Sequence, residues 1–277
     1  MQTTSISWCD YTWNPQTGCS RIGPICYDSD AGVPKCYAEK FSRRQERTDS
    51  KWTPENADEN VTMHPERVED PDEYHFPEGP GRVFVGSMTD MFHSETDPAF
   101  VQDVLDVCAR HPEHVWIWLT KRPHNAADWR LDWPENCLLG TSVGSAGHEY
   151  PSTLHRIEQL RDIDVGLKWV SFEPLLEPIG EVALDHIDWV VVGGESAPDE
   201  HRREMKHEWA DEIRRQCRDE GIPFYFKQSS SARPEQGTAL TVYNEEYGVF
   251  EQREIRDFPE LPTVAKAARA DREEITS

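Results

Sequence analysis

Short apolar runs recur along the chain, and nearly all of them end in polar or glycine residues. The runs are rich in β-branched and aromatic residues, which favour strands. We expect seven strands, over residues 5–8 (or 5–13 if the first is longer), 83–85, 115–119, 137–140, 167–170, 188–192 and 223–226. Because most runs are continuous rather than alternating, they predict a sheet that is covered on both faces.

Segments with helical periodicity lie between these runs. The pattern predicts helices over residues 37–46, 98–111, 152–161 and 207–220. Asp97 is suited to cap the second helix, and Gly221 is suited to end the fourth. Strands that alternate with helices predict βα units on a parallel sheet.

Polar residues that could do chemistry follow at least six of the runs directly, at their carboxyl ends. In a (β/α) barrel these ends meet at one mouth that holds the active site. An open doubly wound sheet would instead gather them at one switch point. The sequence therefore predicts an α/β protein with a partial or closed (β/α) barrel of about seven parallel strands, and the open sheet is the alternative.

Two segments fall outside this repeat. One is an acidic, proline-rich insertion, and the other is a C-terminal extension with two short expected strands before an acidic tail. The expected organisation is a barrel domain over residues 1–228, with a cysteine-rich loop at 14–38 and the insertion at 48–82, then the extension at 229–277.

The charge is strongly negative and is spread along the chain. The 277 residues include 52 acidic and 29 basic ones, for a formal charge of −23, and lysines number eight against 21 arginines. This balance favours a high-salt cytoplasm, as in a halophile or its virus-infected host, because screening there removes self-repulsion. A cationic partner is the alternative. The charge neither supports nor excludes a nucleic-acid substrate.

No apolar stretch approaches the ~20 residues of a membrane span. The first five residues also lack the basic start and apolar core of a secretion signal. We therefore expect a cytoplasmic protein that does not contact a membrane.

Seven cysteines without a visible export signal argue against a disulfide framework. Cys108, Cys137 and Cys217 lie in apolar strand or helix patterns and are expected to be buried thiols. Cys9 is ambiguous, because it follows Trp8 in an alternating segment.

Cys19, Cys26 and Cys36 lie instead in a segment dense in glycine and proline, with little apolar pattern to bury them. Thiolates bind soft metals, and three on one loop leave one metal position open. This suits a [4Fe–4S] cluster whose fourth iron binds a substrate or cofactor. The alternatives are three unconnected thiols, or a zinc site completed by a histidine such as His64, His75 or His93.

A set of short blocks carries a resemblance to a known family. The blocks are Trp8, Asp10, residues 12–15 and 17–19, Cys26, and residues 36–39, 87–93, 119–123, 171–175, 193–196 and 226–228. In this order they resemble a phage-associated family of unknown function with a three-cysteine motif near the N-terminus. The resemblance implies a radical-SAM-like protein, in which a partial barrel holds a [4Fe–4S] cluster on Cys19, Cys26 and Cys36 near S-adenosylmethionine.

The cysteine spacing departs from the family pattern. The second and third cysteines of the family are typically separated by two residues, whereas nine residues separate Cys26 from Cys36 here. The loop must therefore bulge outward for both sulfurs to reach one cluster. Gly32 and Pro34 permit such a turn.

A second departure concerns the Gly193-Gly194-Glu195 element, which follows the sixth expected strand. In mainstream radical enzymes the corresponding element follows the second strand and holds the amino group of the cofactor. In this chain the second strand ends in Ser87, Thr89 and Asp90, which could take that role.

If a cluster binds, the polar strand ends acquire roles. The cofactor-binding candidates are Ser87, Thr89, Asp90, Glu173, Gly193, Gly194 and Glu195. Lys121 and Arg122 could bind the cofactor carboxylate or a substrate phosphate, and Lys227 and Gln228 could face the substrate. The catalytic candidates are Lys121, Glu173 and Lys227. Asp90 and Glu195 could instead cap the next helix.

The leading hypothesis is a radical-SAM-like iron–sulfur enzyme with an electron donor and an unknown substrate, of which a nucleoside or nucleic-acid base is the first candidate. The alternative is a non-enzymatic accessory protein of a phage or provirus, whose cysteine loop binds zinc. A third hypothesis is a barrel enzyme that uses Asp90, Glu173 and Lys227 for acid–base chemistry without a metal. The sequence leaves open whether a partner protein is required.

Overall fold

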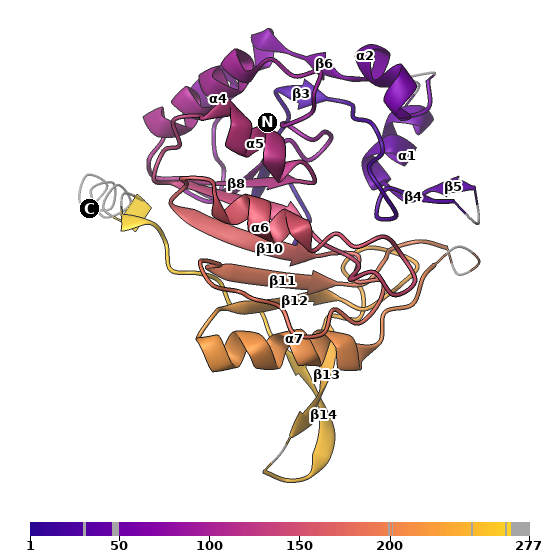
Figure 1. Cartoon of the computed structure of the whole chain (residues 1–277). Coiled ribbons are helices and arrows are strands. Elements are labelled where there is room, and N and C mark those ends of the chain that lie inside the picture. Colours follow the sequence, from indigo (N-terminus) through magenta and orange to yellow (C-terminus); the bar gives the residue numbers. More distant parts are fainter. Residues whose placement is uncertain are drawn as a thin grey trace.

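The largest element of the fold is an eight-stranded sheet (Figure 1). The computed structural model describes residues 1–29, 32–45, 50–198, 200, 202–244, 246–263 and 265–266. In spatial order the strands are β1 (Gln2–Thr3), β2 (Tyr11–Trp13), β7 (Arg82–Val85), β8 (Val115–Thr120), β9 (Cys137–Ser142), β10 (Leu167–Phe172), β11 (Trp189–Gly193) and β12 (Phe224–Gln228).

Seven of these strands are parallel, namely β2 and β7 to β12. They pair in the order in which they occur along the chain. Only β1 is antiparallel, at the β2 edge. The protein is therefore a mixed α/β structure with a large, mostly parallel sheet, as the apolar runs predict. No pairing joins β12 to β1 or β2 among the described strands, so closure into a barrel stays a prediction.

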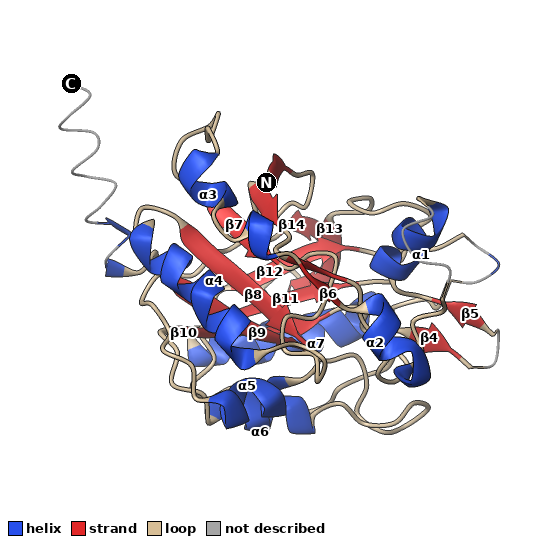
Figure 2. Cartoon of the chain, turned by 90° about the horizontal axis from the view of Figure 1, so that it is seen from above, coloured by secondary structure: helices blue, strands red, loops and turns tan. Residues whose placement is uncertain are grey.

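The helices after the strands pack on one face of the sheet (Figure 2). Their bounds are α4 (Pro98–Arg110), α5 (Pro123–Trp129), α6 (His155–Arg161) and α7 (His207–Glu220). Asp97 caps α4 by accepting a hydrogen bond of 2.9 Å from the Ala99 amide. Gly221 ends α7 in a left-handed conformation. The sequence pattern missed the short α5, and it placed the start of α6 three residues too early.

The two faces of the sheet bury different sets of side chains, because neighbouring residues of a strand point to opposite faces. The helices cover Val83, Val85, Trp116 and Trp118 on one face. Phe84, Ile117, Trp169 and Trp189 on the other face form an aromatic cluster with Trp8, Tyr225 and Ala265. Both faces are covered, as predicted: α4 to α7 cover one face, and Trp8 and the residues around Ala265, of which 265–266 are helical, cover the other. Because the described parallel strands follow one another in chain order, they contain no reversal of strand order, and the switch point of the doubly wound alternative is not seen among them.

The first parallel strand lies at the end of the longer predicted range, 5–13, and not over residues 5–8. Residues 5–8 are not a strand: the chain turns there, and the Cys9 amide donates to the carbonyl of Ile6 at 3.1 Å. This turn inserts the ring of Trp8 into the aromatic cluster, where the centroids of the Trp8 and Phe84 rings are 4.8 Å apart. The strand itself, β2, begins at Tyr11.

The other elements lie around the cysteine loop, the insertion and the extension. They are β3 (Gln16–Thr17), β4 (Tyr27–Asp28), β5 (Val33–Pro34), α1 (Tyr37–Arg44), η1 (Pro54–Asn56), α2 (Ala57–Asn60), β6 (Thr62–Met63), η2 (Pro65–Arg67), α3 (Asp70–Glu73), β13 (Ala239–Asn244) and β14 (Val249–Glu254). The insertion is tied to the cysteine loop because β6 pairs with β3.

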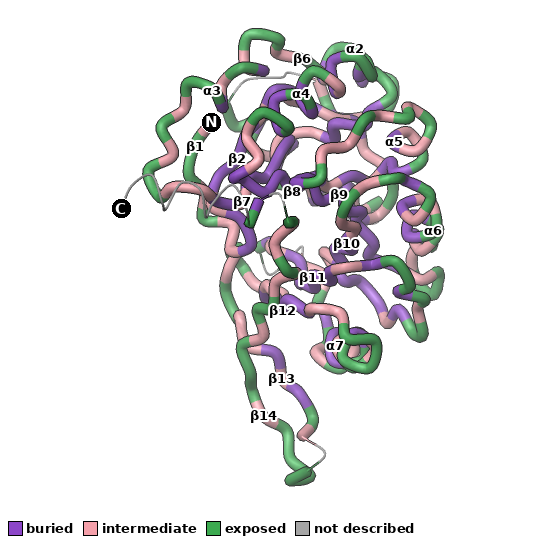
Figure 3. Tube along the Cα trace, turned by 90° about the vertical axis from the view of Figure 1, so that its left-hand side faces the viewer, coloured by how far each residue is buried: buried purple, intermediate pink, exposed green. Residues whose placement is uncertain are grey.

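The expected strand pair of the extension is present as the β13–β14 hairpin, which projects from the body with a largely exposed tip (Figure 3). After the hairpin, the chain returns to the sheet, where the Asp257 carbonyl accepts from Trp189 Nε1 at 2.9 Å. The acidic tail from residue 267 lies outside the described residues. The domain boundaries therefore remain a prediction.

Among the described residues, no helix is both long enough and apolar enough to cross a membrane.

Gly140 makes a testable contribution to this core. A Cβ atom there would lie 2.3 Å from the Trp169 ring. Overpacking of this kind typically costs about 1–3 kcal/mol. We expect Gly140→Ala to lower the free energy of unfolding by that amount in urea denaturation. The control is the double variant with Trp169→Phe, whose smaller ring should make the two effects less than additive. Strict additivity would contradict the proposed contact.

Candidate functional site

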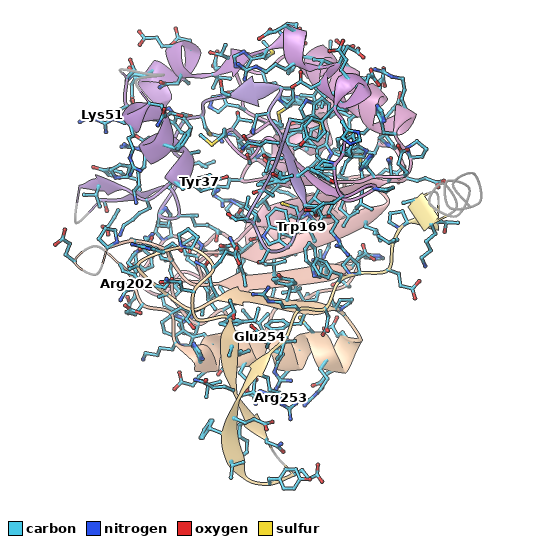
Figure 4. All side chains as sticks on the ribbon, turned by 180° about the vertical axis from the view of Figure 1, so that it is seen from behind. Tyr37, Lys51, Trp169, Arg202, Arg253 and Glu254 are labelled. Atoms are coloured by element: carbon cyan, nitrogen blue, oxygen red, sulfur yellow. The ribbon has the colours of Figure 1, made fainter. Side chains whose placement is uncertain are left out.

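A cavity of about 350 Å³ lies at the carboxyl ends of the parallel strands, within the range of ~300–1,000 Å³ that is usual for ligand pockets. The structure brings nearly all of the predicted site residues to its wall. These are Cys19, Cys26, Cys36, Ser87, Thr89, Asp90, Lys121, Arg122, Glu173, Gly194, Glu195, Lys227 and Gln228. Gly193 does not line the cavity. Figure 4 shows Tyr37, which also lines it, toward the side on which the strands end, and Trp169 within the sheet.

The widened cysteine spacing is accommodated by a hairpin. The residues between Cys26 and Cys36 form β4 and β5, and Gly32 has a positive φ of 65° beside the tip. The amides of Lys35 and Cys36 both donate to the carbonyl of Cys26, at 2.9 and 3.2 Å. The extra residues therefore bulge outward, as expected, and the two cysteines lie side by side at the base of the hairpin.

Burial dominates the chemistry of these thiols. It raises the pKa of Cys19 to about 12, against the opposing effect of Arg122. It also raises the pKa of Cys36, against the opposing effect of Lys121. Thiols of this kind are poor nucleophiles at neutral pH, and a bound metal is what would displace their protons.

Within the described residues, no three His, Cys, Asp or Glu side chains are placed to hold a single metal ion. The histidines considered for zinc are engaged elsewhere or exposed. His93 Nε2 lies 2.7 Å from Ser20 Oγ, His64 Nε2 lies 2.8 Å from Thr17 Oγ1, and His75 is exposed. In a four-iron cluster each thiolate binds a different iron, so the sulfurs surround a volume rather than a point. Three sulfurs around one cavity fit that donor set.

The end of β7 is held by the segment that leads to Cys19. Asn14 Oδ1 accepts from the Met88 amide at 2.9 Å, and Gln16 Nε2 donates to Thr89 Oγ1 at 2.8 Å. Thr89 Oγ1 in turn donates to the carbonyl of Gly18 at 2.6 Å. Ser87 likewise bonds Asn14. The hydroxyls proposed for the cofactor therefore already bind the chain itself.

Gly18 is required at this junction. Its φ is +85°, and a Cβ atom would lie 1.7 Å from the carbonyl oxygen of Asn60. No side chain fits between the two segments, so Gly18 allows the insertion to pack directly against the start of the cysteine loop.

Asp90 is buried at the end of β7 and uses both carboxylate oxygens within the protein. Oδ1 accepts from Thr120 Oγ1 at 2.6 Å, and Oδ2 accepts from the Lys121 amide at 3.1 Å and from Arg122 Nη1 at 2.9 Å. Although burial raises its pKa, Arg122 and these hydrogen bonds hold the pKa of Asp90 below its usual value. Asp90 is therefore an ionised anchor for Arg122.

Glu195 performs a similar task on the other side of the cavity. Its Oε2 is 3.1 Å from Lys35 Nζ, in the β4–β5 hairpin, and its Oε1 is 2.5 Å from Arg203 Nη2. Arg203 also donates to the carbonyl of Pro24 at 2.9 Å. Glu195 thus links the end of β11 to both sides of Cys26. Because Asp97 caps α4 and α7 begins after Lys206, the helix-cap alternative for Asp90 and Glu195 is wrong.

Glu173 and Lys227 form an ion pair of 2.5 Å at the ends of β10 and β12. Burial lowers the pKa of Lys227, but Glu173 more than offsets this and the net shift is upward, so the amine is charged at neutral pH. A Cβ on Gly193 would lie 3.3 Å from the Glu173 carboxyl carbon, and one on Gly194 would lie 2.3 Å from the Ser230 amide. The glycine pair therefore makes room for this ion pair and for the chain after β12.

Lys121 differs from these groups. In the part of the chain that the structure describes, its Nζ has no ion pair and no hydrogen bond, although the residue lines the cavity. Ser142 and Ser171, whose hydroxyls were not among the predicted site residues, line the cavity at the ends of β9 and β10. Their position directly after apolar runs was the available signal. These three side chains can meet a ligand without breaking a contact within the protein.

The link between Lys35 and Glu195 can be tested in the metal-free protein. We expect Lys35→Met to lower the free energy of unfolding by about 1–3 kcal/mol, because it removes a buried charged donor, and to speed proteolysis within residues 22–36. Urea denaturation and mapped limited proteolysis measure the two effects. Lys51→Met is the matched control, since Lys51 is exposed (Figure 4). Equal effects of the two variants would contradict the role of Lys35.

No curated protein matches this sequence. Two solved structures are similar to it. One is a cysteine-to-serine mutant of spore photoproduct lyase, with a TM-score of 0.43 and 13% identity over 70% of this chain and 58% of that chain. The other is a tyrosine-to-phenylalanine mutant of the same protein, with a TM-score of 0.38 and 11% identity over 99% of this chain and 76% of that chain.

The chain therefore spans 58% of the length of the first of these neighbours. A family described as a protein of unknown function (DUF5131) matches residues 3–269. Because this match covers nearly the whole sequence, the chain belongs to the DUF5131 family.

Proposed function

We propose that this protein is an iron–sulfur enzyme that holds a [4Fe–4S] cluster on Cys19, Cys26 and Cys36 and uses S-adenosylmethionine for radical chemistry. The observation that carries the proposal is the arrangement of three thiols, Cys26 buried and Cys19 and Cys36 half-buried, around one cavity at the strand ends, with Cys26 and Cys36 aligned by the base of a hairpin. A cluster bound there would supply the electron that cleaves S-adenosylmethionine. The protein supplies binding, orientation and protection from water.

The side chains with unused hydrogen-bonding capacity are the ones that would touch the cofactor. Lys121 Nζ is suited to the carboxylate of its methionine part. The hydroxyls of Ser142 and Ser171 are suited to ribose or amino groups. Asp90 and Glu195 would act indirectly, by fixing the cations and loops that shape the cavity.

The Glu173–Lys227 pair would face the substrate. Trp8 and Phe84 also line the cavity, with their rings tilted by 58° to each other. Aromatic rings beside charged hydrogen-bonding groups suit a planar, polar ring such as a nucleobase.

Anaerobic purification tests the proposal. We expect a brown protein with about four irons per chain, and release of 5′-deoxyadenosine from S-adenosylmethionine after reduction. Cys26→Ala and Cys36→Ala should each abolish the colour. Cys108→Ala is the control, because Cys108 is a fully buried thiol in the helix-covered core and should not affect iron.

Two results would contradict the proposal. Iron that survives Cys26→Ala would mean that the ligands are wrongly assigned. A colourless protein with one zinc per chain would favour the accessory role.

We also propose that the protein works in a high-salt cytoplasm. The Debye length falls from about 10 Å at 0.1 M salt to about 3 Å at 1 M, so repulsion among 52 acidic residues should fade. The midpoint of thermal unfolding is therefore expected to rise steadily in KCl up to about 1 M. Sucrose, which stabilises without screening charge, is the control. A midpoint that rises no more in KCl than in sucrose would contradict this proposal.

A further inference from the structure

Arg122 lies against the sulfur of Cys19 and is held there by the protein alone. Its Nη1 is 2.9 Å from Asp90 Oδ2 and 3.5 Å from Cys19 Sγ. Its Nη2 donates to both the carbonyl and the hydroxyl of Ser20, at 2.9 and 3.1 Å. The residue is only 6% exposed. One guanidinium therefore contacts the carboxylate, the sulfur and the residue after Cys19 together.

The partners of Arg122 are themselves fixed. Besides its contacts with Thr120 and the Lys121 amide, Asp90 Oδ1 accepts from the Phe92 amide at 3.2 Å. The amide of Arg122 also donates to Thr120 Oγ1 at 2.8 Å. A buried carboxylate with this many donors cannot rotate freely, so the guanidinium is oriented before any cofactor binds.

Ser20 is fixed from the opposite side by His93. The Glu95 amide donates to His93 Nδ1 at 3.1 Å, which leaves the proton on Nε2, and Nε2 lies 2.7 Å from Ser20 Oγ. Burial lowers the pKa of His93 to about 4, so the ring is neutral at pH 7. The backbone beside Cys19 is thus held between Arg122 and His93.

The three cysteines differ in the hydrogen-bond partners of their sulfur atoms. Cys26 Sγ lies 3.8 Å from the carbonyl of Ile22, an acceptor that cannot stabilise a thiolate. Among the described residues, Cys19 is the only one of the three whose sulfur accepts a hydrogen bond from a cation. Lys121 acts on Cys36 through its charge without a hydrogen bond to the sulfur, so Cys19 would be the ligand of a cluster that a cation contacts directly.

We propose that Arg122, held by Asp90, is a positioning residue that raises the reduction potential of the cluster through its N–H contact with the Cys19 sulfur. This inference rests on the proposed function. Reduction adds one electron from an external donor (dithionite in the test) to the cluster, and no bond in the protein forms or breaks. The added negative charge is stabilised by the adjacent guanidinium, because hydrogen bonds to the sulfurs and nearby charge set the potential of such clusters.

Arginine is specifically required by this geometry. Its planar fork lets one side chain bond Asp90, Cys19 and Ser20 at once. A lysine would keep the positive charge but could not make all of these contacts. Arg122→Gln removes the charge and Arg122→Lys retains it, so the two variants separate the effect of charge from the effect of orientation.

The test is a potentiometric titration of the reconstituted holoprotein with dithionite, followed by the electron paramagnetic resonance signal of the reduced cluster. We expect Arg122→Gln to lower the reduced-to-oxidised ratio at a fixed potential about tenfold, which is a shift of 59 mV for one electron. Arg122→Lys should give a smaller shift in the same direction. Arg110→Gln is the matched control, because Arg110 pairs with Glu69 and Asp72 on the surface and should leave the potential unchanged.

The outcomes are distinguishable. An iron-free wild type overturns the proposed function and this inference with it. A wild type and an Arg122→Gln variant that both bind the cluster at the same potential overturn only the inference, as does an equal shift in Arg110→Gln. If Arg122→Gln takes up no iron, Thr120→Val replaces it, because this variant loosens Asp90 and Arg122 while keeping the charge. A small downward shift then supports the inference, and an unchanged potential overturns it.

Discussion

The buried ion pair between Asp90 and Arg122 connects the parts of the molecule that matter for the site. Asp90 follows β7, Arg122 follows β8, and the guanidinium reaches Ser20 in the cysteine loop. Removing one partner of such a pair typically costs about 3–5 kcal/mol, because the other charge is left buried and alone. The pair therefore fixes the position of Cys19 relative to the strands of the sheet, although Cys19 lies on a loop.

Much of the sheet could be predicted because strands that are covered on both faces consist of consecutive apolar residues. The runs that begin at Val115 and Cys137, for example, became β8 and β9 with correct starts. The shorter range predicted for the first strand was wrong for a physical reason. Trp8 fills the aromatic cluster from a turn, and hydrophobicity alone does not distinguish a buried turn from a strand.

For the candidate site, the sequence identified the residues but not their partners. Position after a strand predicts which side chains reach the cavity, because parallel strands end on one side. It does not predict that Glu195 forms a salt bridge with Lys35, a residue 160 positions away. Lys121 and Lys227 look equivalent in the sequence. Only the fold shows that Lys227 is paired with Glu173, whereas Lys121 faces the cavity without a partner among the described residues.

Because a hairpin connects Cys26 to Cys36, the length of the loop between them does not determine where the two sulfur atoms lie. Its two ends are joined at the Cys26 carbonyl, so residues beyond that point do not set the distance between the cysteines. Lengthening a loop costs only about 0.6 kcal/mol for each doubling. The part of the loop beyond the Lys35 contact is thus a place where a peptide tag or a fluorescent reporter can be inserted while Cys26 and Cys36 keep their relative positions.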